Sequence, residues 1–447
     1  MKSPEIFAAS EPDKTPDKTI AFGPFRLDPY RRRVTRITTG EMLALTGRPF
    51  EALHYLVSRP GILVPKAELF RAVWKGISVE ENSLARCIST IRKALGDTPK
   101  GRIYIVTEPG RGYRFVAPVT TPGVSADAGL HRSSASSDAN QLYVSACSLL
   151  SRPGSHTILL ALEKLQAACR LDPAFALAHA GIANANVLLG VFGLAAPLSV
   201  FPKARAAASA AVTLCDTLAD GHLQLGHIAA MFELDRSSAD SHLRRALSLD
   251  ERSAMAHHHI ALLAMTAGQF DEALAWMRRA LDLQPLAANI RANIGMILYY
   301  AGRYQEAVAL LEATIEIHDF AHARSLLGRC WLRLGQFEKA LEQFRLRKEA
   351  SIGSAADEPA ALALAGRLDD SEAKLDALLA SRKTGYVSAY DLATVYAARR
   401  AHTSALDWLE IAMEERAQPI AALGVDPAFR ELYGEPRFLA LLHRLRS

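Results

Sequence analysis

The clearest periodic pattern in the first hundred residues lies in "ENSLARCISTIRKALG", residues 81–96. Its apolar residues recur every three or four positions, at Leu84, Ile88, Ile91 and Leu95. On a helix of 3.6 residues per turn such positions share one side. The spacing therefore predicts a helix with one buried side and one exposed side.

Shorter patterns surround this helix. Three short strands are predicted in "IAFGPFRLD", "RRVTRI" and "EMLALT", followed by amphipathic helices in "RPFEALHYLVSRPG" and "PKAELFRAVW". Trp74 at the end of the second helix is predicted to anchor the core. Downstream, residues 103–107 and 113–116 predict two strands joined by a Gly-rich turn with Arg111 at its tip. The predicted order is a small sheet, three helices and a β-hairpin.

The pattern changes after residue 118. Residues 119–140 are rich in Ser, Ala, Gly and Pro without a periodic apolar side, which predicts a flexible linker. Residues 1–19 have no apolar signal-peptide core and are predicted to be disordered. Residues 141–447 predict helices throughout. The uncharged run of residues 173–202 contains polar residues and a central proline, so it predicts a soluble helix pair and not a membrane span.

The helical segments repeat. Glycine recurs at intervals of 34 and 33 residues, at Gly268, Gly302 and Gly335. Five residues after each glycine stands an alanine, in a column that begins one repeat earlier: Ala239, Ala273, Ala307 and Ala340. Glycine permits a tight turn, and small residues let two helices approach closely. This period resembles the tetratricopeptide family, most strongly over residues 254–349. An irregular helical bundle is the alternative, because several repeats depart from the pattern.

The charge is unevenly distributed. Residues 19–118 contain 17 Lys and Arg against 8 Asp and Glu, a net charge of +9, whereas residues 119–447 contain 32 against 35, a net charge of −3. This asymmetry predicts that the first part binds a polyanion.

The exposed side of the predicted helix at 81–96 carries amide, hydroxyl and cationic side chains without a carboxylate. These side chains are Asn82, Ser83, Arg86, Ser89, Thr90 and Lys93. Hydrogen-bond donors and cations of this kind suit base edges and phosphates.

The words "FEAL", "LFRAVW", "SLARCISTIRKALGD" and "GRGYRFVAPV" in this order resemble the OmpR/PhoB-type winged-helix domain over residues 20–118. The resemblance implies an α+β winged helix-turn-helix whose third helix enters the major groove of double-stranded DNA. It implies DNA contact for the six side chains above and wing contact for Arg111 and Arg114. The alternative for Arg114 is a position on the solvated side of the hairpin. For Arg92, an ion pair with Glu51 is favoured over a base contact.

The residues ahead of residue 20 do not resemble the phosphoacceptor receiver domain of this family. No membrane-spanning helix is evident after residue 118. Joined to an all-α tetratricopeptide-type superhelix, the domain resembles HilA-like soluble regulators. The sequence therefore predicts a cytoplasmic protein without membrane association.

Other reactive side chains give weak signals. Five cysteines stand far apart, which predicts buried thiols of a reducing compartment, with Cys87 facing the core. His257, His258 and His259 are consecutive, so on a helix they point about 100° apart and do not share one ion. No catalytic, metal-binding or cofactor-binding motif stands out, which predicts that the protein is not an enzyme.

The repeats predict an inner surface lined by the first helix of each pair. Residues predicted to lie near it are Met255, His258, Leu262, Asn289, Met296, Tyr299, Tyr300, Ser325, Arg329 and Arg333. Tyr299, Arg329 and Arg333 predict a groove for an acidic peptide or protein, such as RNA polymerase or another partner. The alternatives are a second copy of the chain or a small ligand.

Two function classes follow from these patterns. The first is a transcription regulator whose winged helix binds promoter DNA while the repeats bind a partner, an effector or a second protomer. The second is a repeat-based adaptor whose winged helix binds protein. The excess of cations on the third helix and the wing favours the first.

Overall fold

A computed structural model describes residues 19–29, 31–37, 39–74, 82–97, 103–108, 110–117, 119–120, 134, 136–150, 154–285, 287–347 and 354–445. Its contacts divide the chain into two compact units, Met1–Gly129 and Leu130–Ser447. The predicted disordered N-terminus lies outside the described residues except for Thr19.

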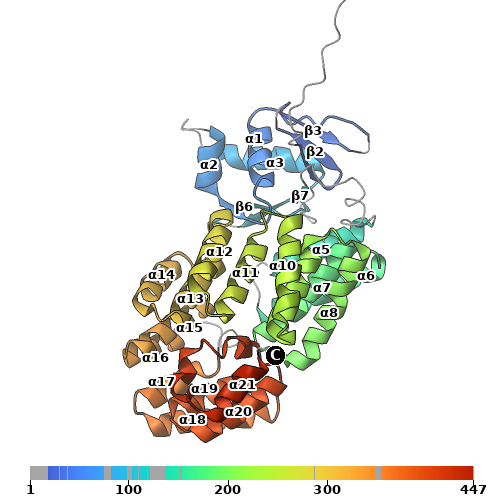
Figure 1. Ribbon diagram of the computed structural model, residues 1–447. Helices are drawn as coiled ribbons and strands as arrows, with labels where there is room; N and C mark the ends of the chain where they lie inside the picture. The colour runs from blue at the N-terminus through green and yellow to red at the C-terminus, as the bar shows by residue number, and fades with distance from the viewer. Residues whose placement is uncertain are drawn as a thin grey trace, which may run out of the picture. The chain divides into compact units, whose positions relative to one another are not determined.

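The first unit combines two small sheets with helices (Figure 1). Its elements are β1 (Ile20–Phe22), β2 (Phe25–Asp28), β3 (Arg33–Arg36), α1 (Arg48–Val57), β4 (Leu63–Pro65), α2 (Lys66–Trp74), α3 (Asn82–Leu95), β5 (Ile105–Glu108), β6 (Gly112–Phe115) and β7 (Val119–Thr120). One sheet has the strand order β3-β2-β1-β7 and the other β4-β6-β5. All of these neighbours pair antiparallel. The predicted winged-helix order is therefore confirmed.

The core of this unit lies between the helices and both sheets. Phe22 and Phe115 pack edge to face with ring centres 5.2 Å apart, and the apolar side of α3 joins them through Ile88 and Ile91. Trp74 is buried and stacks on Phe70, as predicted for a core anchor. The predicted strand in "EMLALT" is wrong, because this segment forms only a single bridge between Met42 and Thr35.

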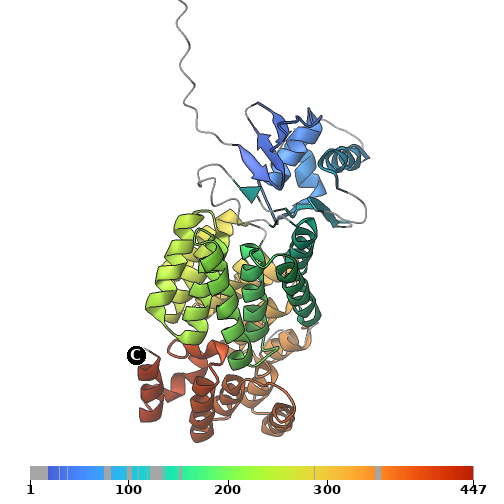
Figure 2. The same cartoon turned by 90° about the vertical axis from the view of Figure 1, so that its right-hand side faces the viewer.

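The second unit is a stack of paired helices (Figure 2). The helices are α5 (Ser137–Leu150), α6 (Ser155–Leu171), α7 (Ala176–Val191), α8 (Pro197–Leu214), α9 (Ala219–Ile228) with the π-turn η1 (Ala229–Glu233), α10 (Arg236–Leu249), α11 (Ala254–Thr266), α12 (Phe270–Leu283), α13 (Ala288–Tyr300), α14 (Tyr304–Ile317), α15 (Ala321–Arg333), α16 (Phe337–Arg345), α17 (Asp357–Leu364), α18 (Leu368–Arg382), α19 (Ala389–Ala398) and α20 (His402–Glu414). Two 3₁₀ turns, η2 (Gln418–Ala422) and η3 (Pro427–Leu432), and a last helix, α21 (Pro436–Arg444), follow.

The predicted turn glycines have the left-handed conformation that the repeat requires. Gly268, Gly302 and Gly335 have φ angles of 77°, 75° and 72°. The alanines five residues further on are fully buried. Leu234 and Arg400 occupy the position of the turn glycine in other repeats. They have φ angles of 62° and 59° although neither is glycine. Repeats therefore extend beyond the stretch in which glycine marks them.

Both ends of the predicted linker belong to folded elements. Val119 and Thr120 form β7, which pairs with β1, and α5 begins at Ser137, three residues before the predicted end. This part of the prediction is wrong because the sequence pattern does not show that β1 offers a pairing edge. Residues 121–133 and Ala135 lie outside the described residues. The uncharged run of residues 173–202 contributes to α7 and α8. Within the described part of the chain, no helix is both long and apolar enough to span a bilayer.

Candidate nucleic-acid interface

Helix α3 presents a basic, hydroxyl-bearing side to the solvent. Arg86, Ser89, Thr90 and Lys93 are exposed, whereas Ser83 is half-buried. The Thr90 hydroxyl donates to the backbone carbonyl of Arg86 at 3.0 Å, which still leaves its oxygen able to accept a hydrogen bond. The side chain of Asn82 lies outside the described residues.

Two side chains of the α3 region hold the wing strand in place. The Arg92 guanidinium donates to the Ile105 carbonyl at 2.8 Å and to the Thr107 hydroxyl at 2.7 Å. The Asp97 carboxylate accepts backbone N–H groups at the start of β5, including that of Ile105 at 3.1 Å. Because these hydrogen bonds are charge-assisted and partly buried, they fix the helix relative to the wing. The predicted Arg92–Glu51 ion pair is wrong: Glu51 pairs with Arg32.

The turn between β5 and β6 exposes Arg111. Its backbone N–H donates to the Glu108 carbonyl at 3.0 Å, and Gly110 before it has a φ angle of 73°. Gly112 after it lies so close to β4 that a Cβ atom there would collide with the Val64 carbonyl. Glycine at these two positions therefore shapes the turn and leaves the Arg111 side chain outside.

The Arg114 side chain is paired within its own domain. Its guanidinium pairs with the Glu108 carboxylate at 2.8 Å and donates to the Gly61 carbonyl at 2.9 Å, and its side chain is 15% exposed. The predicted freely solvated position is therefore wrong, whereas the predicted DNA contact stays a prediction. Arg114 lies on the side of β6 opposite the buried Tyr113 and Phe115, where its partners come from β5 and from Gly61 before β4.

The charges of the first unit are unevenly paired. Each described carboxylate of this unit has a partner: Asp28 with Arg31, Glu41 with Arg36, Glu51 with Arg32, Glu68 with Tyr55, Asp97 with the β5 backbone and Glu108 with Arg114. By contrast, Arg86, Lys93 and Arg111 form no ion pair with any residue that the structure describes. Unpaired positive charge therefore lies on α3 and on the wing turn, as it also does at the exposed Arg26 on β2 and Arg71 on α2.

The cysteines are free thiols. None of the five, all described, forms a disulfide. Cys87 on α3 is buried, and burial raises the pKa of its thiol to about 11. A thiol of this kind stays protonated and unreactive near neutral pH.

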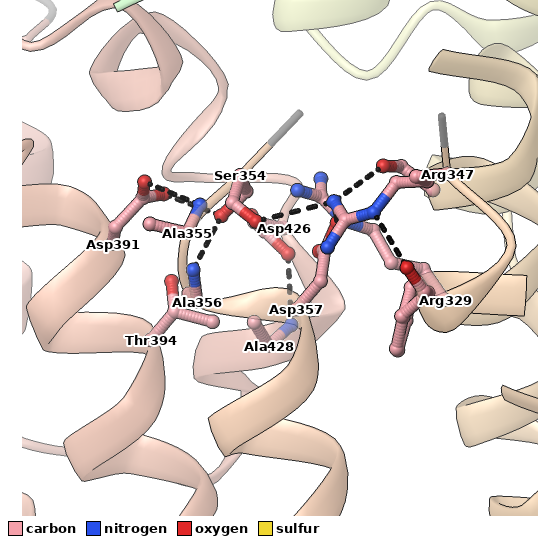
Figure 3. Close-up of polar contacts among 12 residues, drawn as sticks. Arg329, Arg347, Ser354, Ala355, Ala356, Asp357, Asp391, Thr394, Asp426 and Ala428 are labelled. Atoms are coloured by element: carbon pink, nitrogen blue, oxygen red, sulfur yellow. Dashed lines mark hydrogen bonds and ion pairs between the residues drawn. The ribbon is translucent and has the colours of Figure 1, made fainter. Parts of the chain in front are cut away.

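The predicted acidic-partner groove in the second unit is wrong, because the chain itself supplies the acid. Arg329 pairs with the buried carboxylate of Asp357 at 2.7 Å, and Arg347 pairs with the same carboxylate at 2.9 Å (Figure 3). Arg333 donates to the Pro427 carbonyl, and Tyr299 is 3% exposed. Tyr299 is buried, whereas Arg329 and Arg333 are half-buried and paired within the unit. The sequence pattern could not show that their partners come from α17 and from the segment after α20.

Buried and half-buried histidines gather on the first helices of successive pairs. The rings of His227 and His259 have centres 4.1 Å apart, and Asn293 lies within 2.7 Å of His258 and 3.1 Å of His322. Burial lowers the pKa of His258 to about 3 and that of His227 and His322 to about 4, so these imidazoles are neutral at pH 7. Among the residues that the structure describes, no three potential metal ligands lie close enough to share an ion.

Comparison with known proteins assigns both units. Residues 40–115 match the family "Transcriptional regulatory protein, C terminal", and residues 251–319 and 293–355 match tetratricopeptide repeats. The chain carries an OmpR/PhoB-type regulatory domain and tetratricopeptide repeats. Within this OmpR/PhoB-type domain, α3 and the β5–β6 hairpin are the third helix and the wing.

The relatives share this domain. The cholera toxin transcriptional activator of Vibrio cholerae is 33% identical over 107 residues, which are 23% of this chain and 36% of that protein. The transcriptional regulator HilA of Salmonella typhimurium is 39% identical over 72 residues, or 16% of this chain and 13% of HilA. The solved DNA-binding domain of Escherichia coli CadC is 28% identical, covers 23% of this chain and 96% of that domain, and has a TM-score of 0.21. The chain thus spans about a third or less of the length of these two full-length relatives.

Proposed function

We propose that this protein is a DNA-binding transcription regulator. The observation that carries the proposal is the unpaired positive charge of Arg86, Lys93 and Arg111 on a helix and a turn that are locked together. A B-DNA major groove admits an α-helix, and a wing at fixed distance from that helix reaches the adjacent backbone. The names of the relatives, which are transcriptional activators and regulators, support the same function.

The side chains divide by chemistry into two roles. Arg86 lies in the middle of the exposed side of α3 and suits bidentate donation to the O6 and N7 atoms of guanine. Lys93 near the C-terminal end of α3 and Arg111 on the wing suit phosphates, which position the protein without specifying a base. We assign Asn82, Ser83, Ser89 and Thr90 to further base or phosphate hydrogen bonds.

The tetratricopeptide repeats are proposed to bind a protein partner or a second protomer, and RNA polymerase is one such partner. Residues 121–133 are proposed to tether the repeats to the DNA-binding unit. The proposal involves no catalytic step and no cofactor, and it places the protein in the cytoplasm, where its DNA ligand is.

The proposal is tested by mapping the DNA that the full chain binds in cells and then measuring affinity for that site and for random DNA. Replacing Arg86 by Ala should cost about 1 to 3 kcal/mol on the mapped site and little on random DNA. Lys93→Ala should weaken both equally and reduce the salt dependence by about one phosphate contact, a log–log slope of about 0.9.

Arg31→Ala is the matched control, because Arg31 is a 71% exposed cation of the same unit outside α3 and the wing. It should leave specific affinity within about 0.5 kcal/mol of that of the unaltered chain. Binding that does not respond to salt, or the same loss for Arg31→Ala as for Arg86→Ala, would contradict the proposal. Either result would favour an adaptor whose winged helix binds protein.

A further inference from the structure

The segment after α20 lies against the first helices of the repeats. We call residues 417–433 the C-terminal strap. Its turn η2 contacts η1 and α11, and its turn η3 contacts α19. The Gln418 amide donates to the Met231 carbonyl at 3.4 Å, and the Pro427 carbonyl accepts from Arg333 at 3.2 Å. In Figure 1 the red end of the chain lies near the lower end of α11, which η2 contacts.

These contacts place the strap on the inner surface of the repeats. α11, α15 and α19 are each the first helix of a pair, and η1 continues another first helix, α9. In stacked helix pairs the first helices line the inner side, which is the binding surface of such proteins. The strap therefore occupies the surface on which a partner of the repeats would bind.

The strap presents a carboxylate and an aromatic ring to this surface. The Tyr390 hydroxyl of α19 donates to the Asp426 carboxylate at 2.7 Å, and Asp426 is 6% exposed. The ring of Phe429 meets the same tyrosine edge to face at 5.2 Å. Ile420 and Leu423 add fully buried apolar contacts. These are the contacts of a bound peptide: one charged group, one aromatic ring and a few apolar side chains.

The docking of the strap leaves hydrogen bonds unmade. Among the described residues, the Oε1 atom of Gln418 and the Nε atom of Arg333 are buried without a partner. Buried polar atoms without partners weaken the state that contains them. The strap compensates through its covalent attachment, which gives it a high effective concentration at the surface. A partner that satisfies these atoms can therefore compete with it.

We propose that the C-terminal strap is an intramolecular ligand of the inner surface and occupies the site at which a protein partner binds. That partner presents a short helical turn with a carboxylate at its start and, three residues later, an aromatic ring. The inference rests on the proposed partner-binding function of the repeats.

The test uses the full chain and a labelled peptide of residues 417–433, AQPIAALGVDPAFRELY. Asp426→Ala removes the carboxylate from the attached strap but not from the peptide. The variant chain should bind the peptide at least about tenfold more tightly than the unaltered chain, because a single buried hydrogen bond to a charged group has that effect on affinity. Arg430→Ala, an exposed change in the same strap, should bind the peptide as the unaltered chain does.

Hydrogen–deuterium exchange of the unaltered chain provides a test that does not depend on the folding of the variant. Excess peptide should increase exchange at the amides of residues 418–432 and leave α12 and α14 protected. Equal peptide affinity of all three chains, or unchanged exchange at saturating peptide, would overturn the proposal. If the gain in affinity disappears when the protein is diluted, the inner surface binds the strap of a second copy of the chain. That result would overturn the proposal of a different protein as partner.

The proposals for the strap and for DNA binding can be refuted independently. The peptide assay contains no DNA, so its failure leaves the function of α3 unaffected. Loss of DNA affinity in the α3 variants, in turn, does not predict any change in peptide binding.

Discussion

Acidification should destabilise the repeat unit through its buried histidines. His258 on α11 is 6% exposed, and burial lowers the pKa of its imidazole to about 3. Its Nδ1 atom has no hydrogen-bond partner among the described residues, and its surroundings are other neutral groups: Asn293 on α13, His322 on α15 and His227 on α9. Arg329 adds positive charge near His322. None of these groups stabilises a proton on His258.

The sign and size of the effect follow from linkage. The folded pKa lies below the unfolded value of about 6.5, so the unfolded chain binds the proton more readily. Stability is complete above pH 6.5 and falls as the pH decreases towards 3. Each pH unit in this range costs about 1.4 kcal/mol per histidine, which gives about 2 kcal/mol for His258 between about pH 8 and about pH 5. Burial also lowers the pKa of His259, which acts in the same direction.

Urea unfolding of the full chain at both pH values, followed by circular dichroism, measures this effect. His258→Gln has a side chain that does not titrate, so it should remove about 2 kcal/mol of the difference between the two pH values, whatever its effect at either one. The exposed His156→Gln on α6 is the control and should leave the difference unchanged. An equal pH dependence for the unaltered chain and for His258→Gln would refute the reasoning.

Three further predictions concern the repeats. Gly302→Ala should lower the free energy of unfolding by about 1 kcal/mol, because a Cβ atom there has open space but a φ angle of 75°. Arg400→Gly should raise it by about the same amount, since the exposed Arg400 already adopts this conformation; thermal melts of both variants check the opposite signs. Asp357→Asn should destabilise the unit by about 3 to 5 kcal/mol in urea, because it leaves Arg329 and Arg347 without their shared charge, while Asp369→Asn on the exposed side of α18 should have little effect.

The sequence predicted the features that depend on local periodicity. The apolar side of α3 follows from spacing alone, and so does the exposure of Arg86 and Lys93 opposite it. The turn glycines at Gly268 and Gly302 were also predicted, because glycine is the residue that adopts a positive φ angle without strain.

The features that sequence reasoning missed depend on distant partners. Arg114 alternates with apolar residues as an exposed strand residue would, but its guanidinium pairs with Glu108 and with the carbonyl of Gly61, 53 residues earlier. Arg92 and Asp97 fix the wing through backbone groups, which carry no sequence signal. Leu234 and Arg400 occupy turn positions as non-glycine residues, so a search for the glycine period does not find their repeats.

The C-terminal strap also changes how the repeat unit unfolds. A helical solenoid with contacts only between neighbouring pairs frays from its ends, and its stability is a sum over adjacent units. The hydrogen bond from Gln418 to Met231 joins positions 187 residues apart, and the one from Arg333 to Pro427 spans 94. Contacts of this range raise the contact order and close the array between η1 and α19 into one cooperative block. The helix pairs between η1 and α19 are therefore protected from fraying. Helices α5 to α8 lie outside this block and fray as the end of an ordinary solenoid does.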